Sequence, residues 1–330
     1  MRPLTHTRAK QLLPIAGKPI LHHILRDMAK AGISECVLVV SPETKPAIEA
    51  SCKENFAGMA IVYVLQEEPL GLAHAVATAE SALAGEDFLL VLGDNVLRGG
   101  VAPALETFAR VGPDALILLA KVDRPEQYGV AELAGDRVVR LVEKPKVPPS
   151  DLALVGVYIF RASIHRSIAR LVPSARGEYE ITDAIQGLID EGLDVAHRLV
   201  DGWWKDTGRP EDIIEANRLL LADLERRLDG EMTDCRIVGA VVVEGPAFIG
   251  ANTRIDGAQI GPGTSIGRDC VVRTVEIADS IIMDNCRIMA VTHPLVGCLI
   301  GEGCEIYGDD EGRGHLRLVL GDRSQAYVPD

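Results

Sequence analysis

The chain has 330 residues, 47% of them hydrophobic, which suits one or two globular domains with a substantial core. Its formal net charge of −14 argues against general binding to nucleic acid or to an anionic membrane, because both require basic surface. The seven cysteines form no CxxC pair, which argues against a zinc site and favours a reduced, cytoplasmic chain. No apolar run approaches the roughly 20 residues of a membrane span, so neither nucleic acid nor a membrane is an expected partner.

The first two-thirds of the chain alternates helix and strand signals. Pro19 suits the first turn of a helix, and the apolar residues that follow it recur on one helical face. Apolar runs predict buried strands at residues 36–40, 61–65, 88–92, 115–120 and 152–160, and a helix is predicted over 71–83. This alternation predicts an α/β domain over residues 1–209. Its Rossmann-like sheet is expected to be mixed and mostly parallel, with ligands outside the carboxyl ends of the strands.

Two further segments follow this domain. Residues 210–230 open with Pro210, carry apolar residues at helical spacing between charges, and end at Asp229-Gly230, which predicts an amphipathic connecting helix. Residues 231–330 lose the helical period, and short β-branched pairs return about every six residues. This repeat resembles that of a left-handed parallel β-helix, with on the order of five coils. A β-sandwich is the alternative for this region.

Several polar residues stand where a sheet of this kind would bind a ligand. Asp94 follows the strand at 88–92, and Asp206 lies in the segment Trp203–Asp212. Gln66 follows the strand at 61–65 and opens the turn that leads through Pro69 and Gly71 into a helix. Asp-Asn after a strand is also common turn chemistry, and a glycine at a strand–helix junction is ordinary.

Together, six separated segments match one enzyme family in order and span residues 2–217. The chain resembles the sugar-1-phosphate nucleotidylyltransferases, and the trailing repeat makes it most similar to the long-form glucose-1-phosphate thymidylyltransferases. The residues that carry the resemblance include Arg2–Pro19, Gln66–Ala75, Gly93–Asn95, Tyr128-Gly129 with Glu143–Pro145, Val155–Tyr158, and Trp203–Asp212. The resemblance implies that nucleoside triphosphate and sugar 1-phosphate are the small-molecule partners, and a homo-oligomer is expected.

The resemblance also implies roles for individual residues. Lys10 and Lys144 would neutralise phosphate charge, and Asp94 and Asp206 would coordinate Mg²⁺, which makes these four the catalytic candidates. The nucleotide-binding candidates are Gln66, Pro69, Gly71 and Asp94. The sugar-phosphate candidates are Tyr128, Gly129, Glu143, Lys144, Val155, Gly156 and Trp204. Glu143-Lys144 also has an ordinary interpretation as a salt-bridged strand end, and Gly156 as a packing glycine. The segment Arg176–Asp183 is interpreted as chiefly structural, with Arg176 a minor candidate for phosphate binding, and His74 is interpreted as a helix-surface residue.

The implied reaction is transfer of a nucleotidyl group to a sugar 1-phosphate, with dTTP favoured over UTP and glucose 1-phosphate as the favoured acceptor. A catalytically impaired sugar-nucleotide-binding scaffold is the first alternative. An acyltransferase in the β-helix is the second, because hexapeptide β-helices often carry that activity. It would need a catalytic histidine, for which His293 and His315 are the candidates in this region.

One expectation concerns the start of the chain. In the resembling family a strand and a glycine-rich loop precede the segment seen at residues 2–19, and Met1 falls on the apolar position between them. Such a loop cradles the triphosphate, and its strand sits inside the sheet. We therefore expect the chain as written to fold poorly or to be nearly inactive, with Met1 an internal methionine of a longer protein. Upstream in-frame codons for a strand and such a loop would support this expectation, and a stop codon directly upstream would contradict it.

Overall fold

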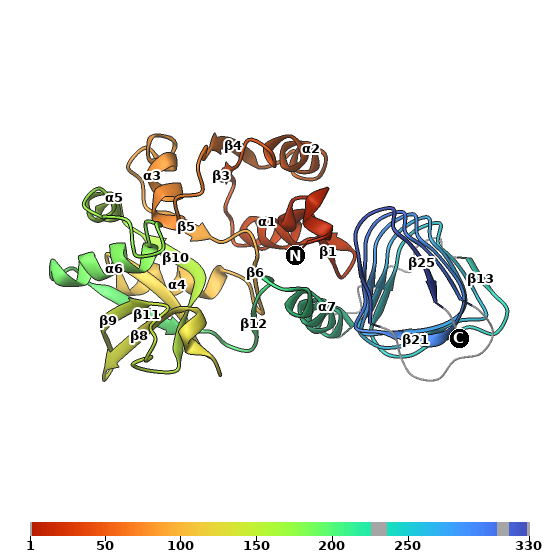
Figure 1. Ribbon diagram of the computed structural model, residues 1–330. Helices are drawn as coiled ribbons and strands as arrows, with labels where there is room; N and C mark the ends of the chain where they lie inside the picture. Colours follow the sequence, from red (N-terminus) through yellow and green to blue (C-terminus); the bar gives the residue numbers. More distant parts are fainter. Residues whose placement is uncertain (1, 226–235, 309–316, 329–330) are drawn as a thin grey trace. The chain divides into compact units, whose positions relative to one another are not determined.

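A computed structural model describes residues 2–225, 236–308 and 317–328 (Figure 1). The chain forms two compact units. One is His22–Lys205, called here the α/β unit, and the other combines Met1–Leu21 with Asp206–Asp330, called here the solenoid unit. By compactness, the first 21 residues thus group with the C-terminal part of the chain. The sequence-based division at residues 209 and 230 stays a prediction.

Helices and 3₁₀ turns form where the sequence alternates polar and apolar residues at helical spacing. The α-helices are α1 (Ile20–Lys30), α2 (Lys45–Asn55), α3 (Leu72–Leu83), α4 (Ala102–Val111), α5 (Ser163–Ile168), α6 (Ile181–Asp190) and α7 (Pro210–Glu225). The 3₁₀ turns are η1 (Leu4–His6), η2 (Lys10–Leu12) and η3 (Pro125–Gln127). α7 coincides with the first part of the predicted connecting helix, and residues 226–230 of that prediction lie outside the described residues.

The α/β unit is built on a mixed six-stranded sheet with the order β11-β7-β10-β8-β9, in which β5 also pairs with β10. Its strands are β5 (Phe88–Val91), β7 (Ala115–Lys121), β8 (Gly129–Ala134), β9 (Arg137–Glu143), β10 (Leu152–Phe160) and β11 (Val195–Leu199). β10 runs antiparallel to β5, β7 and β8, whereas β11 runs parallel to β7. β3 (Glu35–Val40) and β4 (Ala60–Leu65) form a separate parallel pair, and β6 (Asn95–Leu97) pairs with β12 (Trp204–Asp206).

The apolar runs correctly located five strands, namely β3, β4, β5, β7 and β10, and the predicted helix at 71–83 is α3. The predicted burial is found for β7 and β10, whereas β3, β4 and β5 are only partly buried. The prediction for Pro19 was wrong. Pro19 lies in the short strand β2 (Lys18–Pro19), which pairs with β1 (Pro14–Ile15), and α1 begins one residue later. The backbone amide that starts α1, that of Ile20, donates instead to the carbonyl of Leu13 at 3.0 Å. A hairpin contact therefore precedes the helix where a helical first turn was expected.

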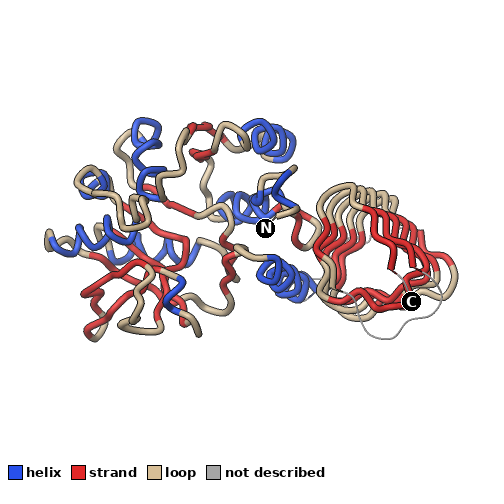
Figure 2. The backbone as a smooth tube through the Cα atoms, viewed as in Figure 1, coloured by secondary structure: helices blue, strands red, loops and turns tan. Residues whose placement is uncertain are grey.

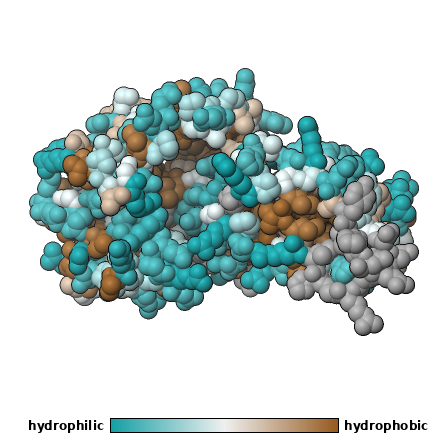
Figure 3. Space-filling model, in the orientation of Figure 1, coloured by the Kyte–Doolittle hydropathy of each residue, from teal (hydrophilic) through white to brown (hydrophobic). Residues whose placement is uncertain are grey.

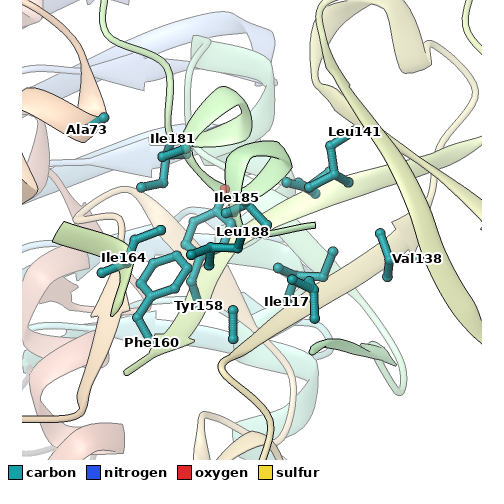
Figure 4. Packing of buried hydrophobic residues seen from close by; sticks show 14 of the residues in the cluster. Ala73, Ile117, Val138, Leu141, Tyr158, Phe160, Ile164, Ile181, Ile185 and Leu188 are labelled. Carbon is teal, nitrogen blue, oxygen red and sulfur yellow. The ribbon is translucent and has the colours of Figure 1, made fainter. Parts of the chain in front are cut away.

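The core of the α/β unit lies between the sheet and the helices that cover it (Figure 4). Ile117 of β7 and Phe160 of β10 are fully buried in one cluster with Ile185 and Leu188 of α6. Fully burying one such side chain stabilises a fold by about 1.5–3 kcal/mol. This packing holds β10 rigidly, and with it the candidate residues on and beside that strand.

The solenoid unit is a stack of parallel strands in register (Figure 2). One face carries β13 (Arg236–Val238), β16 (Arg254–Asp256), β19 (Val271–Ala278), β21 (Arg287–Val296), β23 (Glu305–Gly308) and β25 (Gln325–Val328), and β14 (Val242–Val243) pairs with β17 (Gln259–Ile260). A five-stranded face carries β15 (Ala247–Ile249), β18 (Thr264–Ile266), β20 (Ile281–Ile282), β22 (Leu299–Ile300) and β24 (Val319–Leu320). Parallel stacking confirms the β-helix and excludes the β-sandwich alternative for the described residues.

The two irregular stretches of the repeat have a structural cause. Residues 273–280 and 290–297 fall largely in β19 and β21, which are longer than the other strands of the stack and pair with a register shift between Val275 and Ile277. The interior is a ladder of stacked apolar residues, among them Ile255, Val272, Ile288 and Ile306. The six-residue repeat in the sequence therefore weakens where β19 and β21 extend beyond the length of the other strands, but the stacking of apolar residues in the interior continues.

Two surface properties agree with the composition. Within the described parts of the chain, no helix combines the length and the apolar character needed to cross a membrane. The face drawn in Figure 3 is mainly hydrophilic, with small apolar patches between the charged side chains. Such a surface is expected for a chain with a net charge of −14.

Candidate active site

Asp94 is oriented by its neighbour Asn95 at the carboxyl end of β5. Asn95 is 2% exposed, and its amide nitrogen donates to Asp94 Oδ1 at 2.8 Å. The amide oxygen of Asn95 accepts from the Gly156 backbone N–H at 3.1 Å and from Trp204 Nε1 at 2.6 Å. One buried amide thus ties together three residues predicted for the site, and the structure brings Asp94, Gly156 and Trp204 into a single hydrogen-bonded group.

Gly156 is required by close packing around Asn95. A Cβ at this position would lie 2.7 Å from Asn95 Cγ and 2.7 Å from Leu92 Cδ1, closer than such atoms approach in folded proteins. The preceding residue, Val155, is completely buried. The packing interpretation of Gly156 and a site role are therefore compatible, because the absent side chain lets the amide of Asn95 reach the strand.

The sugar-phosphate candidates continue from Trp204. The Trp204 and Tyr128 rings lie edge to face, with 5.4 Å between their centroids. The Tyr128 carbonyl accepts from the Lys144 backbone N–H at 3.0 Å, and Gly129 is the strand partner of Glu143 in the β8–β9 pair. Lys144 has a φ of +39°, an uncommon conformation for a residue with a side chain. The chain therefore turns sharply at the end of β9.

Glu143 is held by three neighbouring groups. Its carboxylate accepts from Thr182 Oγ1 at 2.7 Å and from Arg176 Nη1 at 3.3 Å, and Lys144 Nζ lies 3.9 Å away. Burial raises the pKa of the Tyr158 hydroxyl, and the nearby charge of Glu143 raises it further. The salt-bridged strand end foreseen as an ordinary interpretation of Glu143-Lys144 is thus present. The Glu143 carboxylate is therefore also held in place beside the ammonium group of Lys144.

Arg176 has a structural environment. Its guanidinium bonds to Glu143 and also to Glu178 at 3.1 Å and Glu180 at 3.3 Å. Three carboxylates around one guanidinium neutralise its charge, which favours the structural interpretation over a phosphate-binding one. Thr182, interpreted from the sequence as structural, contacts Glu143 directly, and its partner lies 39 residues away in the chain.

Gln66 is fixed in one orientation beside the turn into α3. Its amide nitrogen donates to the Gly71 carbonyl at 3.2 Å and to His74 Nδ1 at 2.9 Å. Both donor protons are therefore used, and the amide oxygen is the group that Gln66 offers to a ligand. His74, interpreted from the sequence as a surface residue without a role, instead orients Gln66 and stacks on Tyr179 with 6.3 Å between the ring centroids.

Gly71 allows the turn to pass close to a second segment. Its φ is +103°, and a Cβ there would lie 2.6 Å from the Tyr179 carbonyl oxygen. On either side of it, Tyr179 N–H donates to the Leu70 carbonyl at 2.8 Å, and the Ala73 N–H donates to the Tyr179 carbonyl at 3.0 Å. The exposed Pro69 precedes this paired stretch. The turn with Gln66 and Gly71, which are candidates for nucleotide binding, is thereby connected to the segment that surrounds Glu143.

Lys10 and Asp206 belong to the solenoid unit and lie near each other. The Lys10 ammonium is 4.0 Å from Asp206 Oδ1, and the two side chains are 21% and 38% exposed. The described residues contain no cluster of three or more His, Cys, Asp or Glu side chains suited to a metal. Mg²⁺ bound to a nucleotide needs fewer protein ligands, because phosphate oxygens and waters complete its shell. Asp94 in the α/β unit and Asp206 in the solenoid unit each carry the hard carboxylate oxygens that Mg²⁺ prefers.

Comparisons with known proteins agree over nearly the whole chain. A family model described as "Nucleotidyl transferase" matches residues 1–223. Glucose-1-phosphate thymidylyltransferases from Streptomyces griseus and Streptomyces antibioticus are 41% and 43% identical over 343 residues, each covering 99% of this chain and 96% of the relative. A solved protein from Bacillus anthracis, described as a glucose-1-phosphate thymidylyltransferase in complex with a sucrose, has a TM-score of 0.62 and 29% identity, covering 66% of this chain and 89% of its own.

Proposed function

The chain belongs to the nucleotidyl transferase family, and we propose that it transfers a thymidylyl group from dTTP to glucose 1-phosphate and releases pyrophosphate. The observation that carries the proposal is the connected group of side chains from Asp94 through Asn95 and Trp204 to Tyr128. This connection supports the proposal, because it joins the carboxylate proposed to bind the metal to residues proposed to bind the sugar phosphate. The two Streptomyces relatives, both glucose-1-phosphate thymidylyltransferases, support the choice of substrates.

The reaction needs positioning and charge neutralisation more than proton transfer. An oxygen of the sugar phosphate attacks the α-phosphorus of dTTP, a new P–O bond forms, and the bond to the β-phosphate breaks as pyrophosphate leaves with the electron pair. Because the attacking oxygen is already anionic, no general base is required. Lys10 and Lys144 would stabilise the negative charge that spreads over the phosphates.

A divalent metal would supply further neutralisation of phosphate charge, with Mg²⁺ the proposed ion. Asp94 and Asp206 would each contribute carboxylate oxygens to it. Asn95, by donating to Asp94 Oδ1, would hold this carboxylate in a fixed orientation toward the ion. Cytoplasmic location and a homo-oligomeric state are part of the same proposal, because they are the sequence-based expectations for a biosynthetic enzyme of this kind.

Recognition of the base would depend on Gln66. Its amide oxygen accepts hydrogen bonds, and a pyrimidine such as thymine or uracil presents an N–H donor on its pairing edge. Thymine and uracil differ by one methyl group, which contributes only about 1–3 kcal/mol to discrimination. We therefore expect dTTP to be preferred and UTP to be used more slowly.

The proposal is tested by pyrophosphate release from dTTP and glucose 1-phosphate with Mg²⁺, with UTP and with N-acetylglucosamine 1-phosphate in parallel. The assay is run on this chain and on a version extended by its upstream codons. We expect magnesium-dependent release in at least one of the two versions, with the rate for dTTP exceeding that for UTP by about 10-fold. A folded protein that binds dTTP and releases no pyrophosphate in either version would support the scaffold alternative.

For the acyltransferase alternative, His293 lies on β21 and His315 lies outside the described residues.

Replacing His74 tests the orientation of Gln66. In H74A the amide of Gln66 loses one of its two partners, so we expect the KM for dTTP to rise about 3- to 10-fold with kcat nearly unchanged, the loss of about one hydrogen bond. H74N, whose side-chain oxygen can accept the same bond, is expected to recover part of the affinity. A fall in kcat of about 3- to 10-fold with an unchanged KM would contradict the role of His74 in orienting Gln66, because it would indicate that fewer molecules are folded.

A further inference from the structure

The segment that carries Lys10 is attached to the corner of the solenoid. Arg8 forms a salt bridge with Glu302, which lies in the turn between β22 and β23. The Thr7 hydroxyl donates to Asp322 Oδ2 at 2.8 Å, and Asp322 occupies the matching turn of the next coil, between β24 and β25. Two acidic side chains on successive coils therefore hold two residues just before Lys10.

The two acidic side chains are themselves fixed. Asp322 Oδ1 accepts from the Glu302 backbone N–H at 2.9 Å, so its two oxygens connect the solenoid corner to Thr7. Glu302 Oε1 accepts from Asn285 Nδ2 at 3.3 Å while its other oxygen bonds to Arg8. The attachment is thus a network across three coils. It does not depend on one isolated surface ion pair, which would contribute little.

Packing contacts extend the attachment on both sides of these bonds. A Cβ on Gly321 would meet Pro3 at 3.2 Å, and a Cβ on Gly17 would meet the Phe248 ring at 2.3 Å. Both glycines therefore allow the N-terminal segment and the solenoid to approach closely. The residues before and after Lys10 are both seated on coils of the solenoid.

We propose that Glu302 and Asp322 are positioning residues for the transferase reaction, acting through Arg8 and Thr7 on Lys10. The inference rests on the proposed function of Lys10 as a phosphate-binding cation. A lysine side chain is long and flexible, so its useful placement depends on the backbone that carries it. The solenoid would contribute to catalysis by holding that backbone without contacting substrate.

The test uses the full chain with E302Q, which removes the charge of Glu302 and keeps its size. We expect the KM for dTTP to rise about 10-fold while the KM for glucose 1-phosphate and the Tm change little. Amide hydrogen exchange of residues 2–13 is expected to accelerate about 10-fold. The matched control is E305Q, because the Glu305 carboxylate bonds to Tyr307 and Gln325 on the same solenoid.

A charge swap separates positioning from direct action. R8E and E302R should each impair the enzyme, whereas the double variant R8E/E302R should recover most of the dTTP affinity. Failure of the double variant to recover would overturn the proposal, since Arg8 would then act on substrate itself. Exchange rates and KM in E302Q that equal those of the wild type would also overturn it. If neither the chain as written nor its extended version shows transferase activity, the proposed function fails, and the hydrogen-exchange comparison still decides whether Glu302 orders the segment.

Discussion

Replacing Asp206 with asparagine is expected to lower kcat by about 10²–10³-fold, the scale of losing one strong electrostatic contribution to a transition state. The asparagine side chain would keep the shape of the aspartate but remove its charge. The Lys10 ammonium lies 4.0 Å from Asp206, so the substitution also changes the charge balance around the cation proposed to bind phosphate. Initial rates of pyrophosphate release across a range of Mg²⁺ concentrations measure the effect.

The control for this prediction is D201N. Asp201 lies five residues before Asp206 in the chain, its side chain is 88% exposed and it pairs with Arg198, and such surface pairs contribute about 0–1 kcal/mol. D201N should therefore retain wild-type kcat. A D206N variant with wild-type kcat and unchanged Mg²⁺ dependence would remove Asp206 from the proposed metal site. Equal Tm values for wild type and D206N would show that any loss of kcat comes from the reaction and not from loss of folded protein.

Asn217 is expected to be the most sensitive polar residue of the solenoid unit. It is fully buried on α7, and its amide oxygen accepts from the Ala16 N–H and the Ser265 hydroxyl, each at 2.7 Å. Its amide nitrogen donates to the Gly263 carbonyl at 2.7 Å. In N217A these three partners would be left buried without their bonds. We expect the free energy of unfolding to fall by about 3 kcal/mol.

Urea unfolding followed by circular dichroism measures this change, with R218A as the control. Arg218 is the next residue on α7 and is exposed, so its substitution should change stability by no more than about 0.5 kcal/mol. N217D, which keeps both acceptor positions and loses the donor, should fall between N217A and the wild type. Equal stabilities for N217A and R218A would contradict the role of Asn217 as the link between the N-terminal segment, α7 and the solenoid.

Side-chain partners that lie far apart in the chain were beyond the reach of the sequence. Asn95 was recognised only as part of a strand-end motif, yet it bonds to Gly156, 61 residues away, and to Trp204, 109 residues away. Thr182 and Glu143 are a similar pair. His74 is different, because it lies just past the Gly71 junction, on the helix that follows Gln66. A polar residue in the first turn of that helix, facing back toward the turn, was a local signal that could have identified it.

Local periodicity was enough to identify the elements that repeat or alternate along the chain. Apolar runs locate the strands β3, β4, β5, β7 and β10. A strand covered on both faces excludes polar residues, which explains the runs of β7 and β10, whereas β3, β4 and β5 are partly exposed. The six-residue repeat identifies the solenoid, because each coil must bury the same small set of positions. The same reasoning placed Asp94 at the end of a strand.

Which distant residues meet depends instead on how the elements pack. Strand order, the antiparallel course of β10, and the grouping of residues 1–21 with the solenoid all follow from long-range contacts. Neither Arg8 nor Glu302 carries a signal in its own neighbourhood, and each acquires its partner because a solenoid corner lies beside the N-terminal segment. Hydrogen bonds and ion pairs depend on spatial separation, whereas a sequence pattern records only separation along the chain.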